Sequence, residues 1–158
     1  MTRTFETRAK FGCSAAQLFS LYADPAFQEG RARALGAHTA TCAVTSETEA
    51  EIVVRLEATR PSFSGRGDES SVMSMTLDRA TRGSCWTQTV RGYESRARVE
   101  GTSQVVELGP ARAELIVRGS IEIRIPIVGR VIESKIVGAM DKLAAREAEY
   151  IRKYLAGS

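Results

Sequence analysis

Residues 126–155 read PIVGRVIESKIVGAMDKLAAREAEYIRKYL, and this stretch decides the fold. At about 100° per residue, the helical period, its apolar side chains fall on one face and most charged ones on the other. The apolar face holds Ile132, Ile136, Met140, Leu143, Ile151 and Tyr154. Pro126 suits the start of a helix and Gly157 its end. A helix of about 27 residues is about 40 Å long, so it needs a broad apolar surface, which a curved sheet provides.

Glu147 interrupts this apolar face, because it projects within about 20° of Ile136. Its carboxylate has three possible surroundings. It can lean outward into solvent, pair with an arginine near the end of the helix, or face a cavity where water or a ligand satisfies it. The sequence leaves these three arrangements open.

Shorter elements precede the long helix. Residues 3–11 alternate like a half-buried strand, and short helices are expected at 15–22 and 25–35, with Ser14 and Asp24 as their N-caps. Six further strands are expected at 37–46, 51–59, 72–78, 85–90, 95–108 and 111–125. Consecutive antiparallel strands form a meander with one face that needs cover. The prediction is a single α+β domain, in which a curved antiparallel sheet of about seven strands packs against the long C-terminal helix.

Glycine and proline mark three irregular places along these strands. Residues 60–71 contain Pro61, Gly65 and Gly67, and are expected to form a mobile loop near one rim of a cavity. Gly101 interrupts a strand, which favours a bulge or a bend. Gly119 lies on the inward side of the last strand, where a missing side chain would give the long helix room to cross.

The composition is that of one ordinary globular domain, with 158 residues of which 43% are hydrophobic. Its net charge of +3 is too small and too dispersed to indicate nucleic-acid binding. Three widely spaced cysteines, Cys13, Cys42 and Cys85, favour a reducing cytoplasm over a disulfide framework. No spacing indicates a metal or nucleotide site, so no cofactor is expected. Neither a signal peptide nor a membrane-spanning run is visible.

Three short patterns at element boundaries carry a family resemblance. They are Cys13-Ser14-Ala15-Ala16-Gln17-Leu18-Phe19, Tyr22-Ala23-Asp24-Pro25-Ala26-Phe27 and Ile125-Pro126-Ile127-Val128-Gly129. These patterns, and the order of elements over essentially the whole chain, resemble the START-like superfamily, also called SRPBCC or Bet-v-type helix-grip proteins. The patterns are similar to a bacterial branch known as a domain of unknown function. They are structural rather than catalytic, so they support the fold more than an activity.

The resemblance implies a cavity between the curved sheet and the long helix. Relatives bind lipids, sterols, polyketides and plant hormones there, and some are polyketide cyclases or dehydratases. No catalytic signature of those enzymes is identified in this sequence, so no catalytic residue is assigned. The candidate ligand-binding residues are Tyr22, Val54, Leu56, Met75, Trp86, Ile136, Met140, Leu143 and Glu147. Trp86, Met75 and Met140 are equally compatible with ordinary core positions.

We expect this chain, as a monomer or weak homodimer, to bind a small hydrophobic or amphipathic molecule of lipid, sterol or polyketide type. One alternative is an enzyme of the polyketide cyclase or dehydratase type, for which Glu147 with Tyr22 or His38 would be the most economical acid–base pair. No spacing shows that these residues meet. Another alternative is a protein-interaction module without a usable cavity, which would have a solid core and an exposed apolar patch.

Overall fold

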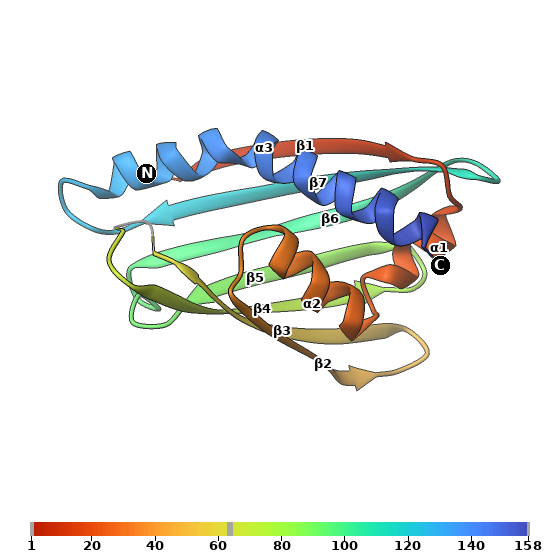
Figure 1. The fold of residues 1–158 in the computed structure, drawn as a ribbon, viewed down its shortest axis with the longest axis horizontal. Coiled ribbons are helices and arrows are strands. Elements are labelled where there is room, and N and C mark those ends of the chain that lie inside the picture. Colours follow the sequence, from red (N-terminus) through yellow and green to blue (C-terminus); the bar gives the residue numbers. More distant parts are fainter. Residues whose placement is uncertain (1, 63–64, 158) are drawn as a thin grey trace.

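A computed structural model describes residues 2–62 and 65–157, which form one antiparallel sheet and three helices (Figure 1). The seven strands lie in the order β1-β7-β6-β5-β4-β3-β2, so β1 and β2 are the edges. The α+β helix-grip architecture expected from the sequence is therefore confirmed. The elements are β1 (Arg3–Phe11), α1 (Ala15–Leu21), α2 (Pro25–Ala34), β2 (Thr39–Glu47), β3 (Glu51–Pro61), β4 (Asp68–Asp78), β5 (Gly83–Val90), β6 (Ala97–Gly109), β7 (Arg112–Ile123) and α3 (Gly129–Ala156).

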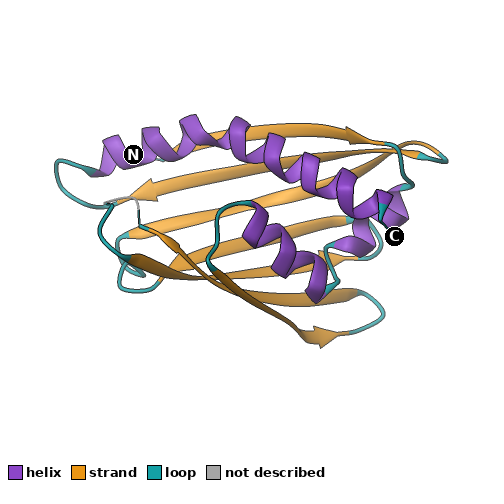
Figure 2. Cartoon of the chain, in the orientation of Figure 1, coloured by secondary structure: helices purple, strands orange, loops and turns teal. Residues whose placement is uncertain are grey.

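The helices cover one face of the curved sheet in two places (Figure 2). The long helix α3 packs over β1 and β7, whereas α2 packs over β2 and β3. The central strands lie beneath the space between these two helices. Phe27 of α2, Leu77 of β4 and Ile151 of α3 are fully buried, so the core joins both helices to the sheet.

The short helices begin where the sequence predicts. The Ser14 hydroxyl accepts a hydrogen bond from the Gln17 N–H at 3.1 Å, and the Asp24 carboxylate accepts one from the Ala26 N–H at 3.0 Å. Pro25 is the first residue of α2, where its missing N–H costs nothing. These caps satisfy helix N–H groups that have no partner within the helix.

The long helix begins three residues later than predicted, at Gly129 instead of Pro126. The chain turns sharply before it, because Ile127 has a left-handed φ of 74°. Gly129 then lies so close to the Ile123 carbonyl that a side chain there would overlap it. A β-branched residue at positive φ is unusual. Ile127 is also 98% exposed.

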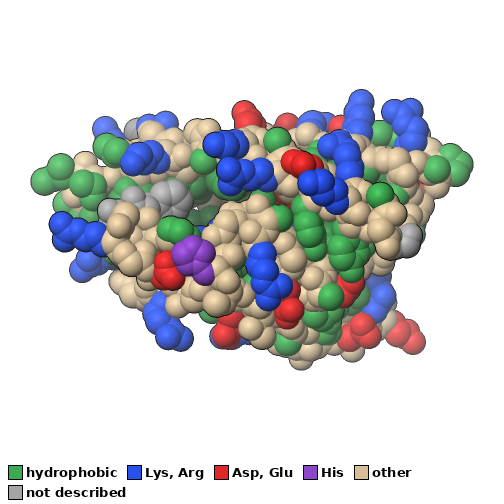
Figure 3. All heavy atoms as spheres, in the orientation of Figure 1, with side chains coloured by type: hydrophobic (Ala, Val, Ile, Leu, Met, Phe, Trp, Pro, Cys, Tyr) green, Lys and Arg blue, Asp and Glu red, His purple; other side chains and the backbone are tan. Residues whose placement is uncertain are grey.

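The start of α3 carries an exposed apolar patch made of Ile127, Val128 and Val131. In Figure 3, hydrophobic side chains protrude at this end of the molecule, and Lys and Arg side chains lie around them. Among the described residues, no helix is both long enough and apolar enough to cross a membrane.

The loop predicted at residues 60–71 is wrong over half of its length, at both ends. Strands β3 and β4 stay paired as far as Pro61 opposite Asp68, so Arg60 and residues 68–71 belong to the sheet. Pro61 is tolerated because it ends its strand. Cross-strand pairing therefore outweighs the local content of glycine, proline and serine. Residues 63 and 64 lie outside the described residues, and mobility of the remaining connection stays a prediction.

Gly101 and Gly119 are the two middle residues of a row that crosses four strands. The sequence suggested a bulge or bend at Gly101 and room for the long helix to cross at Gly119. In the register of the sheet, Phe5 lies opposite Gly119, Gly119 opposite Gly101, and Gly101 opposite Trp86. A Cβ on Gly119 would overlap the Phe5 ring, and one on Gly101 would lie 2.5 Å from Trp86 Cζ2. Both expectations are wrong, because these glycines make room for two aromatic rings. The bulge in this part of the sheet lies at Glu107 to Gly109.

Gly101→Ala should lower the free energy of unfolding by about 1–3 kcal/mol, as overpacking does in well-packed interiors. The new methyl group would overlap the Arg118 carbonyl oxygen, which the backbone holds in place, as well as Trp86. Denaturant titration measures the change. Gly109→Ala is the matched control, because a Cβ there meets no heavy atom within 4 Å. Equal stability of the two variants would contradict this account of the row.

Candidate functional site

A cavity of about 310 Å³ lies between the central strands, α2 and α3. Its volume is at the lower end of the range for small-molecule sites. Eight of the nine candidate residues line it: Tyr22, Leu56, Met75, Trp86, Ile136, Met140, Leu143 and Glu147. Val54 does not, because it is packed into the hydrophobic core and is only 2% exposed. Ligand contact by any of these residues stays a prediction.

The middle of α3 faces this cavity instead of solid core. Ile132, Ile136, Met140 and Leu143 line the cavity and are only half-buried, although they form the apolar face of the helix. The buried residues of α3 are Gly129, Glu133, Ala148 and Ile151, which lie toward its ends. The apolar surface in the middle of the helix is therefore covered only in part by the rest of the protein.

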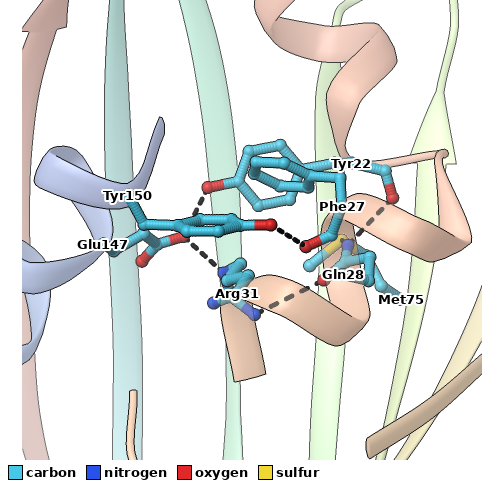
Figure 4. Close-up of polar contacts among 7 residues, drawn as sticks. All are labelled: Tyr22, Phe27, Gln28, Arg31, Met75, Glu147 and Tyr150. Atoms are coloured by element: carbon cyan, nitrogen blue, oxygen red, sulfur yellow. Dashed lines mark hydrogen bonds and ion pairs between the residues drawn. The ribbon is translucent and has the colours of Figure 1, made fainter. Parts of the chain in front are cut away.

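One end of the cavity wall is a polar cluster of Tyr22, Arg31 and Glu147 (Figure 4). These residues come from the C-terminal cap of α1, from α2 and from α3. The Tyr22 hydroxyl donates to Glu147 Oε1, and Arg31 Nε donates to the same oxygen at 2.5 Å. The side chains of Arg31 and Glu147 are each only 13% exposed. Of the three arrangements open for Glu147, it adopts pairing with an arginine, in the wall of the cavity.

Further contacts hold this cluster in place. Arg31 Nη1 donates to Gln28 Oε1 at 3.5 Å, and Gln28 Nε2 donates to the Tyr22 carbonyl at 2.9 Å. The Arg31 guanidinium also lies 5.6 Å from the centre of the Tyr22 ring, within cation–π range. Tyr150, one turn beyond Glu147, donates to the Phe27 carbonyl at 3.1 Å. Backbone and side-chain contacts thus fix all three members.

The charges in the cluster shift the pKa values of its members. Burial, and then the neighbouring Glu147 carboxylate, raise the pKa of Tyr22 well above its usual value. Burial alone would lower the pKa of Arg31, but Glu147 and Tyr22 together outweigh it and the pKa is raised. Tyr22 is therefore neutral and Arg31 charged at any physiological pH. The cluster is organised as an ion pair with a phenol as an additional donor.

Two further charged residues line the cavity, Arg60 on β3 and Glu69 on β4. They lie opposite each other in the sheet register, but no ion pair joins them. Arg60 Nε is buried and has no hydrogen-bond partner among the described residues. His38 is outside the cavity, since its side chain is 55% exposed and pairs with Asp68. Of the two acid–base partners considered for Glu147, Tyr22 contacts it in the structure and His38 does not.

Sequence reasoning missed both arginines. Arg31 had a usable signal, because it lies four residues after Phe27 and so on the same face of α2. Arg60 had none once residues 60–71 were read as a loop. Within the described part of the chain, no group of three or more His, Cys, Asp or Glu side chains could hold a metal ion.

Glu147→Gln should lower the free energy of unfolding by about 3 kcal/mol, because the buried Arg31 would lose its counter-charge. Thermal or denaturant unfolding measures the loss. Glu149→Gln is the matched control on the same helix. Its pair with Lys153 is exposed at 66% and 75% of the two side chains, and pairs this exposed contribute little to stability.

The double variant Arg31→Met with Glu147→Leu tests whether the fold needs these two charges or only requires that neither is left unpaired. Removing both charges leaves no unpaired buried ion, so this variant should be more stable than Glu147→Gln alone. A double variant that is less stable than either single one would show that the fold depends on charge at this place.

Solved structures with the same fold cover nearly all of this chain. An aromatase/cyclase from a Streptomyces species has a TM-score of 0.70 at 14% identity, covering 98% of this chain and 93% of its own. Norcoclaurine synthase from Thalictrum flavum, solved with dopamine and hydroxybenzaldehyde, has a TM-score of 0.67 at 15% identity, covering 99% and 88%. A START superfamily protein from Mycobacterium smegmatis has a TM-score of 0.56 at 17% identity, covering 98% and 94%.

At these identities the likeness shows the fold alone, and the fold is START-like. No curated protein matches the sequence. One family model does, and its description is "Protein of unknown function (DUF2505)". It matches residues 6–155, which is nearly the whole chain. This protein therefore belongs to the DUF2505 family and has the START-like, or SRPBCC, helix-grip fold.

Proposed function

We propose that this protein binds a small hydrophobic or amphipathic molecule, of lipid, sterol or polyketide type, in the cavity between the sheet and α3. The observation that carries the proposal is the half-buried apolar face in the middle of α3. A helix that only completed a core would bury these side chains, as α3 does with Ile151. A ligand would gain about 2.5 kcal/mol for each 100 Å² of apolar surface that it covers.

The surroundings of this face support the same proposal. Trp86, Met73 and Met75 line the cavity from the sheet side, opposite Met140, and methionine packs against ligands of varied shape. The polar groups are few and lie on the wall, as is usual where orientation is set by one or two contacts. The similar solved structures include a START protein and an aromatase/cyclase, which favours a small-molecule site in this fold.

Two further parts of the proposal concern the state and place of the protein. We place its action in a reducing cytoplasm, because Cys13, Cys42 and Cys85 are all free thiols. We propose a monomer or weak homodimer, since the cavity is formed by one chain. Native mass spectrometry of protein purified without removal of lipid tests both the ligand and the oligomeric state.

A tryptophan titration tests binding directly. Trp86 is the only tryptophan and lines the cavity, so its emission should change as decan-1-ol is added and should saturate. Ala144→Phe should weaken this binding by about tenfold or more, because Ala144 lines the cavity and the larger ring takes up space that the ligand needs. Unfolding curves check that the variant is folded.

Ala145→Phe is the matched control, since the adjacent Ala145 is exposed and is not part of the cavity wall. It should bind decan-1-ol like the original protein. No saturable change in the original protein, with any of a series of neutral and charged alkyl amphiphiles, would contradict the proposed function.

An enzyme of the polyketide cyclase or dehydratase type is the second candidate. It is favoured by the Tyr22–Glu147 hydrogen bond, because it places a phenol and a carboxylate side by side on the cavity wall. The raised pKa of Tyr22 makes this phenol a weak acid near neutral pH, and Glu147 already accepts two hydrogen bonds. Both features favour a binding site over proton transfer.

A further inference from the structure

Arg60 is a half-buried cation on the cavity wall, and its Nε has no hydrogen-bond partner among the described residues. A guanidinium presents five N–H donors in a fixed fork and stays charged in proteins. The Arg60 Nε is inaccessible to solvent and makes no hydrogen bond, and no described carboxylate forms an ion pair with this side chain. Such groups are costly to bury unless something pairs with them.

The other charged residues of the cavity do not fill this role. The second arginine, Arg31, is already bonded to Glu147 and Gln28 (Figure 4). Glu69 lies opposite Arg60 on the neighbouring strand and its charge acts on that arginine, but the two side chains do not form an ion pair. Burial raises the pKa of Glu69 despite the nearby arginine, so its negative charge is itself disfavoured there.

The electrostatic surroundings of Arg60 also favour the binding of a negative charge. Burial lowers the pKa of Arg60, and the like charge of Arg31 lowers it further, while the nearby Glu69 carboxylate offsets these effects only in part. An anion bound near the two cations would relieve this repulsion and pair with the Arg60 guanidinium. The apolar wall formed by Trp86, Met73 and Ile136 lies in the same cavity, so one molecule can meet both kinds of surface.

We propose that the ligand of this cavity is an amphipathic anion, whose carboxylate, sulfonate or phosphate group accepts hydrogen bonds from Arg60 while its apolar body lies against the middle of α3. This inference rests on the proposed function and adds the charge of the ligand to it. Charge-assisted hydrogen bonds with a guanidinium are among the strong ones and often form in pairs. Arg60 therefore sets both the orientation of the ligand and the preference for an anion.

A matched pair of probes tests the proposal. Decane-1-sulfonate and decan-1-ol have the same alkyl chain, and the sulfonate stays ionised throughout the working pH range. Followed by Trp86 emission, the sulfonate should bind about tenfold or more tightly than the alcohol. Arg60→Gln should weaken sulfonate binding by about 10- to 100-fold, the range expected for a charge-assisted hydrogen bond. It should change alcohol binding by less than about threefold.

Arg55→Gln is the control for overall charge. Arg55 lies on the same strand, but it is exposed and paired with Glu57. This variant should keep the affinity of both probes. If both probes bind and Arg60→Gln leaves the preference for sulfonate unchanged, or if no preference exists, the inference is overturned while the proposed function stands. If neither probe binds, both fall.

Two other measurements do not depend on the affinity of Arg60→Gln. Without ligand, Arg60→Gln should melt at the same temperature or higher, because it removes a half-buried charge that forms no ion pair with a described residue. A lower melting temperature would show that Arg60 is held by Glu69 in solution, which overturns the inference. Glu69→Gln should strengthen sulfonate binding, since it removes a carboxylate that would repel the anion; weaker binding would contradict the proposal.

Discussion

The buried ion pair between Arg31 and Glu147 is the constraint on which the arrangement of the helices depends. It joins α2, which covers one side of the sheet, to α3, which covers the other. Tyr154, two turns beyond Glu147, adds a hydrogen bond to Asp24 at 2.9 Å. Contacts of this kind fix the distance between the two helices, because an unpaired charge in this position would be costly. The cavity exists because the helices are held at that distance.

At its other end α3 is fixed to the sheet by a different polar contact. Glu133 is 1% exposed, and its Oε2 accepts a hydrogen bond from the Ile123 N–H at 2.7 Å, at the end of β7. The helix is thus held by buried carboxylates near both ends, while the apolar residues between them are only half-buried. Polar contacts define the position of α3, and the apolar side chains in the middle of the helix remain only half-buried.

The fold could be read from the sequence because its signals are local. Alternation in β1, the caps at Ser14 and Asp24, and the long apolar face of α3 each depend on neighbours a few residues away. The site could be predicted only in part, since Glu147 stood out as a charge on that apolar face but its partner is 116 positions away. Gly101 was misread for a similar reason. In the sequence, a glycine that lies opposite a tryptophan on the neighbouring strand has the same appearance as any glycine that interrupts a strand.

The two arginines of the cavity show why burial must be judged together with pairing. Arg31 and Arg60 line the same space and have the same charge, yet the neighbouring carboxylate raises the pKa of Arg31, whereas that of Arg60 is lowered. The difference is one of position: Glu147 projects from α3 toward α2 and pairs with Arg31, while Glu69 lies opposite Arg60 in the sheet and forms no ion pair with it. One arginine therefore contributes to the structure of the free protein. Arg60, in contrast, forms no ion pair with a described carboxylate, and the rest of the cavity wall is mainly apolar.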